Sequence, residues 1–106
     1  MKLLLDECVP RRLRRVFPDH DVFTIEQAGF KGLKNGKLIA AVAGKYDVLL
    51  TVDKNIEHQQ NSKDLPIAIL ILSARTNRFE SLSPLVSMAN EALETIATGE
   101  IIKIES

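Results

Sequence analysis

The sequence has only one cysteine, no long apolar run and no net charge, and each of these excludes a class of protein or of binding. Its single cysteine, Cys8, allows no internal disulfide and favours a reducing compartment. The apolar runs reach only five or six residues, and charge follows Met1 within six positions, so neither a membrane span nor a signal peptide is predicted. We therefore expect a cytoplasmic protein without a membrane partner.

The net charge is zero, with 14 basic and 14 acidic residues, which argues against binding nucleic acid through a strong overall field. The charges are unevenly distributed along the chain. Residues 1–40 carry eight Lys or Arg and five acids (+3), residues 41–74 carry three and four (−1), and residues 75–106 carry three and five (−2). A basic first third beside an acidic pocket would suit a phosphate-rich ligand.

The chain has 106 residues, of which 45% are hydrophobic, and this size predicts one domain, 1–106, with a core that needs no disulfide. Apolar segments predict strands at 3–5, 22–25, 46–52, 67–72 and 101–104, the last as an edge strand. Strands that alternate with helices predict right-handed βαβ crossovers. The expected fold is therefore a three-layer α/β/α domain with a mostly parallel central sheet.

The segments between these strands predict three helices and two less regular connections. In chain order they are a short amphipathic helix over 10–17, an irregular connection over 26–35, a helix from 36, at most one helical turn within 53–64, and a long amphipathic helix over 82–96. The first helix carries four arginines mostly on the face opposite its apolar residues. No repeat, linker or low-complexity segment interrupts the pattern.

Two of the apolar runs each end in a carboxylate. The first runs directly into Asp6, and the third continues through Thr51 and Val52 to Asp53. Apolar runs without alternation are typical of strands buried on both faces of a parallel sheet. Parallel neighbours end at the same edge of a sheet, where open α/β sheets bind ligands, so we expect Asp6 and Asp53 to converge. Such hard oxygen donors favour Mg²⁺ or Mn²⁺.

Simpler explanations exist for several of these polar residues. Aspartate is common at strand ends because it favours turns and helix caps. Glu7 would point away from Asp6 if the strand continued, so it needs a bend to join the site. Asn35 is explained equally well as the N-cap of the helix that begins at Gly36. His20 has no second histidine at ligand spacing, so zinc is not expected.

Basic and polar residues near the predicted site are candidates for substrate binding. Arg11 and Arg12 begin a helix whose amino end should open onto the same crevice, where free amides and the helix dipole attract phosphate. Arginine also binds phosphate in a bidentate manner, although an arginine-rich helix face is equally typical of a solvated surface. The other candidates follow predicted strands: Lys54, Asn55, Arg75 and Arg78.

Three segments, in this order, resemble the PIN-like domains of the DUF5615 family: LLDECVP at 4–10, GLKNGKL at 32–38 and LLTVDKN at 49–55. The segment EHQQN at 57–61 resembles one branch of that family. The resemblance covers essentially the whole chain. It implies a PIN-like α/β/α fold, a ribonuclease activity that depends on Mg²⁺ or Mn²⁺, and frequent pairing with a small antitoxin protein.

Matched position by position, Asp6 and Asp53 fall on the acids that follow two strands in this family. Asn35 falls where many relatives have an acid, and Lys37 where a further acid is often found. An amide brings no charge to a metal site, and a lysine adds a repelling one. We therefore expect Asp6, Asp53, Glu7 and Asn35 as catalytic residues, with Asp6 and Asp53 as the metal ligands.

Two functions fit these observations, and a third is excluded by the sequence. The leading hypothesis is a ribonuclease of PIN-like type, with RNA as its substrate, acting alone, as a homodimer or as the toxin of a toxin–antitoxin pair. The alternative is a catalytically degenerate PIN-like module that binds RNA or protein. A phospho-acceptor receiver domain shares the placement of acids, but it needs a lysine after the fifth strand, and Lys103 falls inside that predicted strand.

Overall fold

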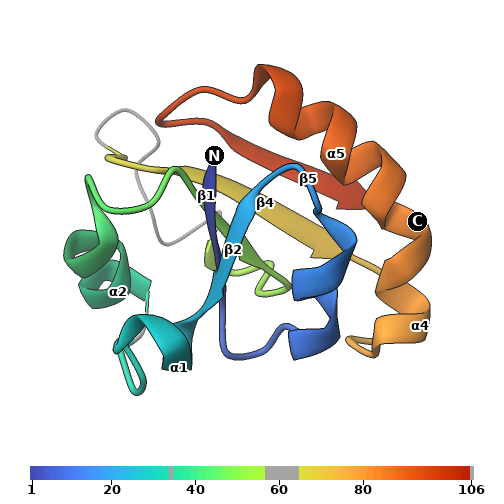
Figure 1. Cartoon of the computed structure of the whole chain (residues 1–106), viewed down its shortest axis with the longest axis horizontal. Helices are drawn as coiled ribbons and strands as arrows, with labels where there is room; N and C mark the ends of the chain where they lie inside the picture. Colours follow the sequence, from blue (N-terminus) through green and yellow to red (C-terminus); the bar gives the residue numbers. More distant parts are fainter. Residues whose placement is uncertain (34, 57–64, 106) are drawn as a thin grey trace.

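A parallel sheet of five strands forms the centre of the molecule, in the order β2-β1-β3-β4-β5 (Figure 1). The computed structural model describes residues 1–33, 35–56 and 65–105. The strands are β1 (Lys2–Leu5), β2 (Asp21–Thr24), β3 (Val48–Thr51), β4 (Ala68–Ser73) and β5 (Ile101–Glu105). Every pairing between these strands is parallel, which confirms the predicted α/β class and the predicted neighbours β1 and β3.

The side of the sheet on which the chain adds strands changes between β1 and β3. The chain first crosses from β1 to β2 on one side, and all later strands are then added on the other side. In open α/β sheets the ligand binds at this switch point, in the crevice beyond the carboxyl ends of the two strands. Leu4 shows the arrangement, because it lies between Phe23 of β2 and Leu49 of β3.

The central strands are apolar throughout because both of their faces are covered. Successive side chains of a strand point to opposite faces, so Leu3 and Leu5 join one core cluster, whereas Leu4 joins the other. All three are at most 1% exposed. This double burial explains why the strands read as continuous apolar runs without alternation.

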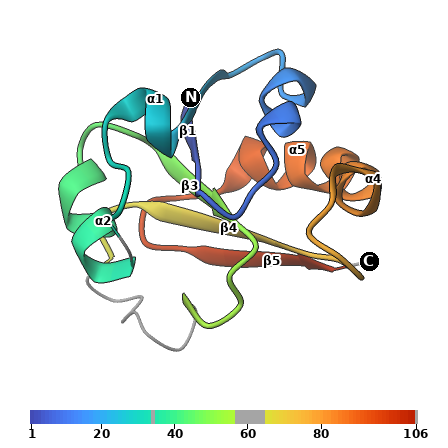
Figure 2. The ribbon, with the colours of Figure 1, turned by 90° about the horizontal axis from the view of Figure 1, so that it is seen from below.

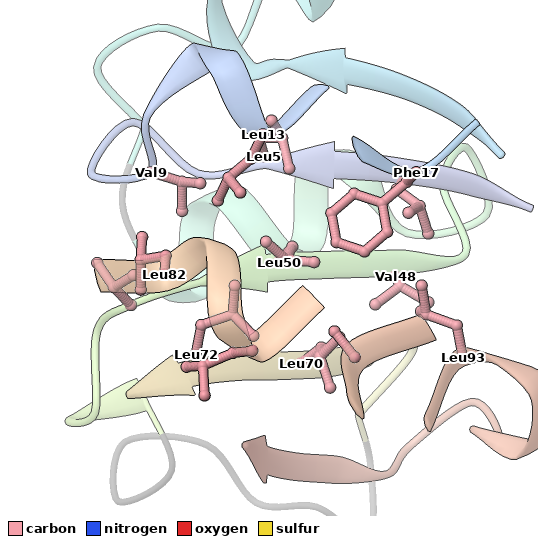
Figure 3. Close-up of a cluster of buried hydrophobic side chains, with 14 of the residues drawn as sticks. Leu5, Val9, Leu13, Phe17, Val48, Leu50, Leu70, Leu72, Leu82 and Leu93 are labelled. Atoms are coloured by element: carbon pink, nitrogen blue, oxygen red, sulfur yellow. The ribbon is translucent and has the colours of Figure 1, made fainter. Parts of the chain in front are cut away.

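One face of the sheet is covered by η1 (Arg11–Val16), α4 (Phe79–Leu82), η3 (Ser83–Leu85) and α5 (Val86–Thr95). Figure 3 shows Leu13, Phe17, Leu82 and Leu93 from this layer around Leu50 and its neighbours in the strands.

No helix within the described residues is long and apolar enough to cross a membrane.

The other face is covered by α1 (Ile25–Ala28) and α2 (Asn35–Val42), with Ile56 and Leu65 filling the space beside them. These two helices lie across the sheet from α4 and α5 in both views (Figures 1 and 2). The molecule therefore has the three layers that the alternation of strands and helices predicts.

Two expectations about the helices need correction. Residues 26–35 are not wholly irregular, because Thr24 and Gln27 form a capping box that begins α1. The long helix over 82–96 starts earlier, at Phe79, and a 3-10 turn interrupts it at Pro84, which lacks the amide hydrogen that an α-helix needs there. The expectation for residues 53–64 falls largely outside the described residues.

Leu70→Ala tests how much of the stability comes from the core above the sheet. Leu70 is 0% exposed, so the substitution removes buried contacts and leaves a cavity, and it should lower the free energy of unfolding by about 2–5 kcal/mol. Urea denaturation measures this change. The control is Met88→Ala at a side chain that is 44% exposed, which should stay within about 0.5 kcal/mol of wild type; equal losses for both would contradict the assigned core.

Candidate functional site

Asp6 and Asp53 lie just beyond the carboxyl ends of β1 and β3, at the switch point of the sheet. The pairing extends one residue past β1, because the amide of Asp6 donates to the carbonyl of Leu50 at 3.0 Å. Both aspartates line one open hollow of about 500 Å³, together with Glu7 and Asn77. We call this space the carboxylate hollow; its remaining lining residues are Cys8, Leu33 and Val52.

The hydroxyl of Thr51 connects the two aspartates. It donates to Oδ2 of Asp6 at 2.8 Å and accepts the backbone amide of Asp53 at 3.1 Å. Thr51 is 0% exposed, so this hydroxyl has no competing bulk water. A threonine in a strand is ordinarily explained by its branched side chain alone, and sequence reasoning therefore gives its polar atom too little weight.

Each aspartate is also held by the backbone next to it. Oδ1 of Asp6 accepts the amide of Glu7 at 2.8 Å, and Oδ1 of Asp53 accepts the amide of Asn55 at 2.9 Å. None of the ion pairs within residues 1–33, 35–56 and 65–105 involves either aspartate. These hydrogen bonds fix the orientation of both carboxylates, and no ion pair among the described residues engages either of them.

Glu7 joins the carboxylate hollow because β1 ends at Leu5 and the chain bends directly afterwards. The alternation of an extended strand, which would turn Glu7 away from Asp6, does not apply beyond that point. Oε1 of Glu7 accepts the amide of Gly32 at 2.8 Å. Gly32 has a φ of +89°, a conformation that glycine adopts readily, and it brings the loop before α2 against this glutamate.

Cys8 is not poised to act as a nucleophile. Burial of the thiol raises the pKa of Cys8 above its ordinary value of 9.0, and the charge of Asp6 raises it further, against opposing hydrogen bonds from Val52 and Thr51. The thiol is therefore protonated at neutral pH, whereas a nucleophilic cysteine needs its thiolate. Its sulfur lies 3.7 Å from Oδ2 of Asp6, where the protonated form can donate a weak hydrogen bond.

The other predicted site residues lie around the carboxylate hollow rather than in it. Asn35 is the first residue of α2, and its side chain lies outside what the structure describes, as does the segment 57–61. Lys37 is exposed on α2. Six further candidates do not line this hollow: Arg11, Arg12, Lys54, Asn55, Arg75 and Arg78. Asn77, which lies in the loop between Arg75 and Arg78, does line it.

The donors of the carboxylate hollow fit a single hydrated divalent ion. Mg²⁺ in proteins is usually held by one or two carboxylates, with water and substrate phosphate filling the other positions. Asp6 and Asp53 line the hollow together and could supply two such carboxylates. Within the part of the chain that the structure describes, no three His, Cys, Asp or Glu residues form a complete metal-binding group, so the set does not fit a cage made by protein alone.

Comparison with protein-family models, curated proteins and solved structures gives no match to this chain. The fold and the site therefore define the class on their own. This is an α/β protein with an all-parallel, doubly wound sheet and two aspartates that line one hollow at its switch point.

Thr51→Val tests the connection between the aspartates. The variant keeps the shape of the side chain, but it removes a hydrogen bond to the carboxylate of Asp6 and leaves the amide of Asp53 without its acceptor. The expected loss in free energy of unfolding is about 1–3 kcal/mol, measured by urea denaturation. Thr98→Val, at an exposed threonine, is the control and should be close to neutral; a neutral Thr51→Val would contradict the described role of the hydroxyl.

Proposed function

We propose that the protein is a ribonuclease that depends on Mg²⁺ or Mn²⁺ and hydrolyses phosphodiester bonds in the carboxylate hollow. One observation carries the proposal: Asp6 and Asp53 line the same hollow at the switch point of the sheet, and no described cation pairs with either of them. The resemblance of the sequence to PIN-like domains, which is carried partly by segments that contain these same aspartates, agrees with the proposal. It is also the reason for naming RNA as the substrate.

Asp6 and Asp53 would hold the ion. When bound, a divalent ion neutralises these carboxylates, polarises a phosphodiester and lowers the pKa of an attacking water. The hydroxyl of Thr51 and the amides of Glu7 and Asn55 hold the aspartates in place before any ligand arrives. Such preorganisation means that little rearrangement is needed during the reaction.

The remaining polar groups of the hollow have separate roles in this proposal. Water attacks phosphorus while the bond from phosphorus to the leaving oxygen breaks, which produces a phosphomonoester and a free hydroxyl. Glu7 accepts the proton released by the water, because it is the third carboxylate of the hollow, and solvent water gives a proton to the leaving oxygen. The side-chain amide of Asn77 donates a hydrogen bond to a non-bridging phosphate oxygen.

A second candidate function is an RNA-binding module of the same fold without catalysis. This alternative is favoured because both oxygens of Asp6 and one oxygen of Glu7 already accept hydrogen bonds within the protein. Fewer lone pairs are then left to bind an ion. A receiver domain is not proposed. Lys103 lies within β5, opposite Ile71, and pairs with Glu105 at 3.4 Å, so it does not occupy the position after the strand that this function requires.

The setting of the proposed activity follows from the resemblance and from the single cysteine. We propose a cytoplasmic enzyme that acts alone or as the toxin of a pair, with a small antitoxin protein as its partner in the second case.

Asp53→Asn should abolish Mn²⁺-dependent cleavage of single-stranded RNA while leaving the fold intact. The asparagine oxygen can still accept the amide of Asn55, but it lacks the charge that holds the ion. Cleavage of a mixed panel of labelled single-stranded RNAs, with Mn²⁺ and with EDTA, measures the activity, and circular dichroism measures the fold. Asp19→Asn makes the same charge change at an exposed residue outside the hollow and should cleave as wild type does.

Isothermal titration with Mn²⁺ separates the two candidate functions. Binding to wild type that Asp53→Asn weakens at least tenfold supports the metal site. If wild type binds RNA but neither binds Mn²⁺ nor cleaves any RNA of the panel, the ribonuclease is wrong and the binding module replaces it.

A further inference from the structure

A second hollow, rich in arginine, lies on the same side of the molecule as the carboxylate hollow and is connected to it. It has a volume of about 690 Å³ and lies between η1 and the start of α1. We call it the arginine hollow; its lining residues are Arg11, Arg12, Arg14, Arg15, Thr24, Glu26 and Gln27. Neither the metal site nor the proposed chemistry accounts for four cations gathered on a chain whose net charge is zero.

A small intermediate hollow of about 230 Å³ joins the two larger ones. It shares Asp6 and Glu7 with the carboxylate hollow, and it shares Arg11, Thr24 and Glu26 with the arginine hollow. The three spaces therefore adjoin one another in this order, and we call them together the path. The path leads from the paired aspartates, past the exposed Lys31, to the arginines of η1.

The geometry of η1 aligns its arginines in two rows. A 3-10 helix has three residues per turn, so side chains three positions apart lie above one another. Arg11 therefore lies in line with Arg14, and Arg12 with Arg15, while the third row faces the core through the fully buried Leu13. Within each row the spacing is one turn, about 6 Å, which is similar to the distance between successive phosphates of an extended nucleic-acid strand.

The first arginine of each row has a partner within the protein. Arg11 pairs with Glu26 at 3.8 Å, and Arg12 pairs with Glu80 at 3.6 Å. The guanidinium of Arg12 also lies 4.1 Å from the centre of the Phe79 ring. These ion pairs are exposed, with the side chains of Arg11 and Glu26 at 79% and 65%, so they contribute little stability and exchange readily for a phosphate.

The second arginine of each row has no such partner. Arg14 and Arg15 are exposed, and among the described residues neither forms an ion pair. Exposed guanidinium groups on one wall of a hollow can bind an anionic ligand without losing an internal contact. Guanidinium binds phosphate through two parallel hydrogen bonds, which makes phosphate the ligand that this wall suits best.

We propose that the arginine hollow binds backbone phosphates of a single-stranded polynucleotide whose reacting phosphodiester lies in the carboxylate hollow. This inference rests on the proposed function and names the route of the substrate across the protein. The intermediate hollow is the smallest of the three, at about 230 Å³, with Val9 and Ile25 among its walls, which favours a single strand over a duplex. An acidic peptide carries charge of the same sign, but the spacing of the arginine rows, which is similar to that of successive phosphates, favours the polynucleotide.

Two consequences distinguish this arrangement from a merely basic surface. The arginines contact the backbone and not the bases, so they should strengthen binding of any sequence to a similar extent. They also lie one hollow away from the aspartates, so a dinucleotide that occupies only the carboxylate hollow should not depend on them. Length dependence and salt dependence are therefore the properties to measure.

Arg14→Gln/Arg15→Gln tests the proposal, because neither side chain has an internal partner to lose. The probe is a labelled ten-nucleotide single-stranded RNA, with binding followed by fluorescence anisotropy in EDTA so that no ion assists binding or cleavage. Affinity should fall on the order of tenfold, and the slope of log K against log salt should become shallower by about 1.4, or 0.7 for each lost phosphate contact. Cleavage of a dinucleotide with Mn²⁺, which needs only the carboxylate hollow, should not change.

The control is Lys2→Gln/Lys45→Gln. It removes the same two charges from a hollow at the opposite, amino-terminal edge of the sheet, where Lys2 and Lys45 lie beside Asp47. This variant should bind the RNA within about twofold of wild type, since distant surface charges are largely screened by salt. An equal loss in both double variants would assign the effect to net charge and overturn the proposed path.

The remaining outcomes separate this inference from the proposed function. If RNA is bound through Arg14 and Arg15 but never cleaved with Mn²⁺, the phosphate path stands and the ribonuclease fails. The path is overturned if wild type binds no polynucleotide, if the arginine variant keeps full affinity and salt slope, or if duplex RNA binds more tightly than the single strand. It is also overturned if polyglutamate of equal length displaces the RNA at equal concentration. Equal binding of single-stranded DNA supports recognition through the backbone.

Discussion

The parallel pairing of β1 with β3 is the constraint on which the rest of this molecule depends. It joins residues far apart in the sequence, such as Leu5 and Leu50, and it makes two buried strands end at one edge. The buried hydroxyl of Thr51 then fixes the polar residues beyond those ends relative to one another. The site is therefore positioned by the most buried part of the fold, where side chains have little freedom to move.

A neutral net charge conceals a strong separation of charge in space. Two aspartates that form no ion pair among the described residues line one end of a series of adjoining hollows, and four arginines line the other end. Interactions between exposed charges fade beyond roughly 10 Å at moderate salt, so the total charge says little about what either end attracts. A strand with negative charge can be held at the arginines, and a positive ion at the aspartates, by the same neutral protein.

The sequence predicts the fold better than it predicts the site, for physical reasons that particular residues show. The double burial of Leu3 to Leu5 leaves a clear pattern, and so does the aspartate after each central strand. The role of the Thr51 hydroxyl leaves no such pattern in the sequence, because one of its partners, Asp6, is distant in the chain. The grouping of Arg14 with Arg11 also depends on whether a six-residue helix is α or 3-10, which helical periodicity in so short a segment does not decide.

The central place of the amino-terminal strand has a consequence for how the chain matures during synthesis. β1 precedes both of its partners in the chain, and one of them, β3, begins only at Val48. Pairing between segments so distant in sequence forms slowly, because a long loop must close before any contact stabilises it. A nascent chain still short of β3 contains Asp6 but not Asp53, so this surface cannot assemble until the segment that follows β3 has left the ribosome.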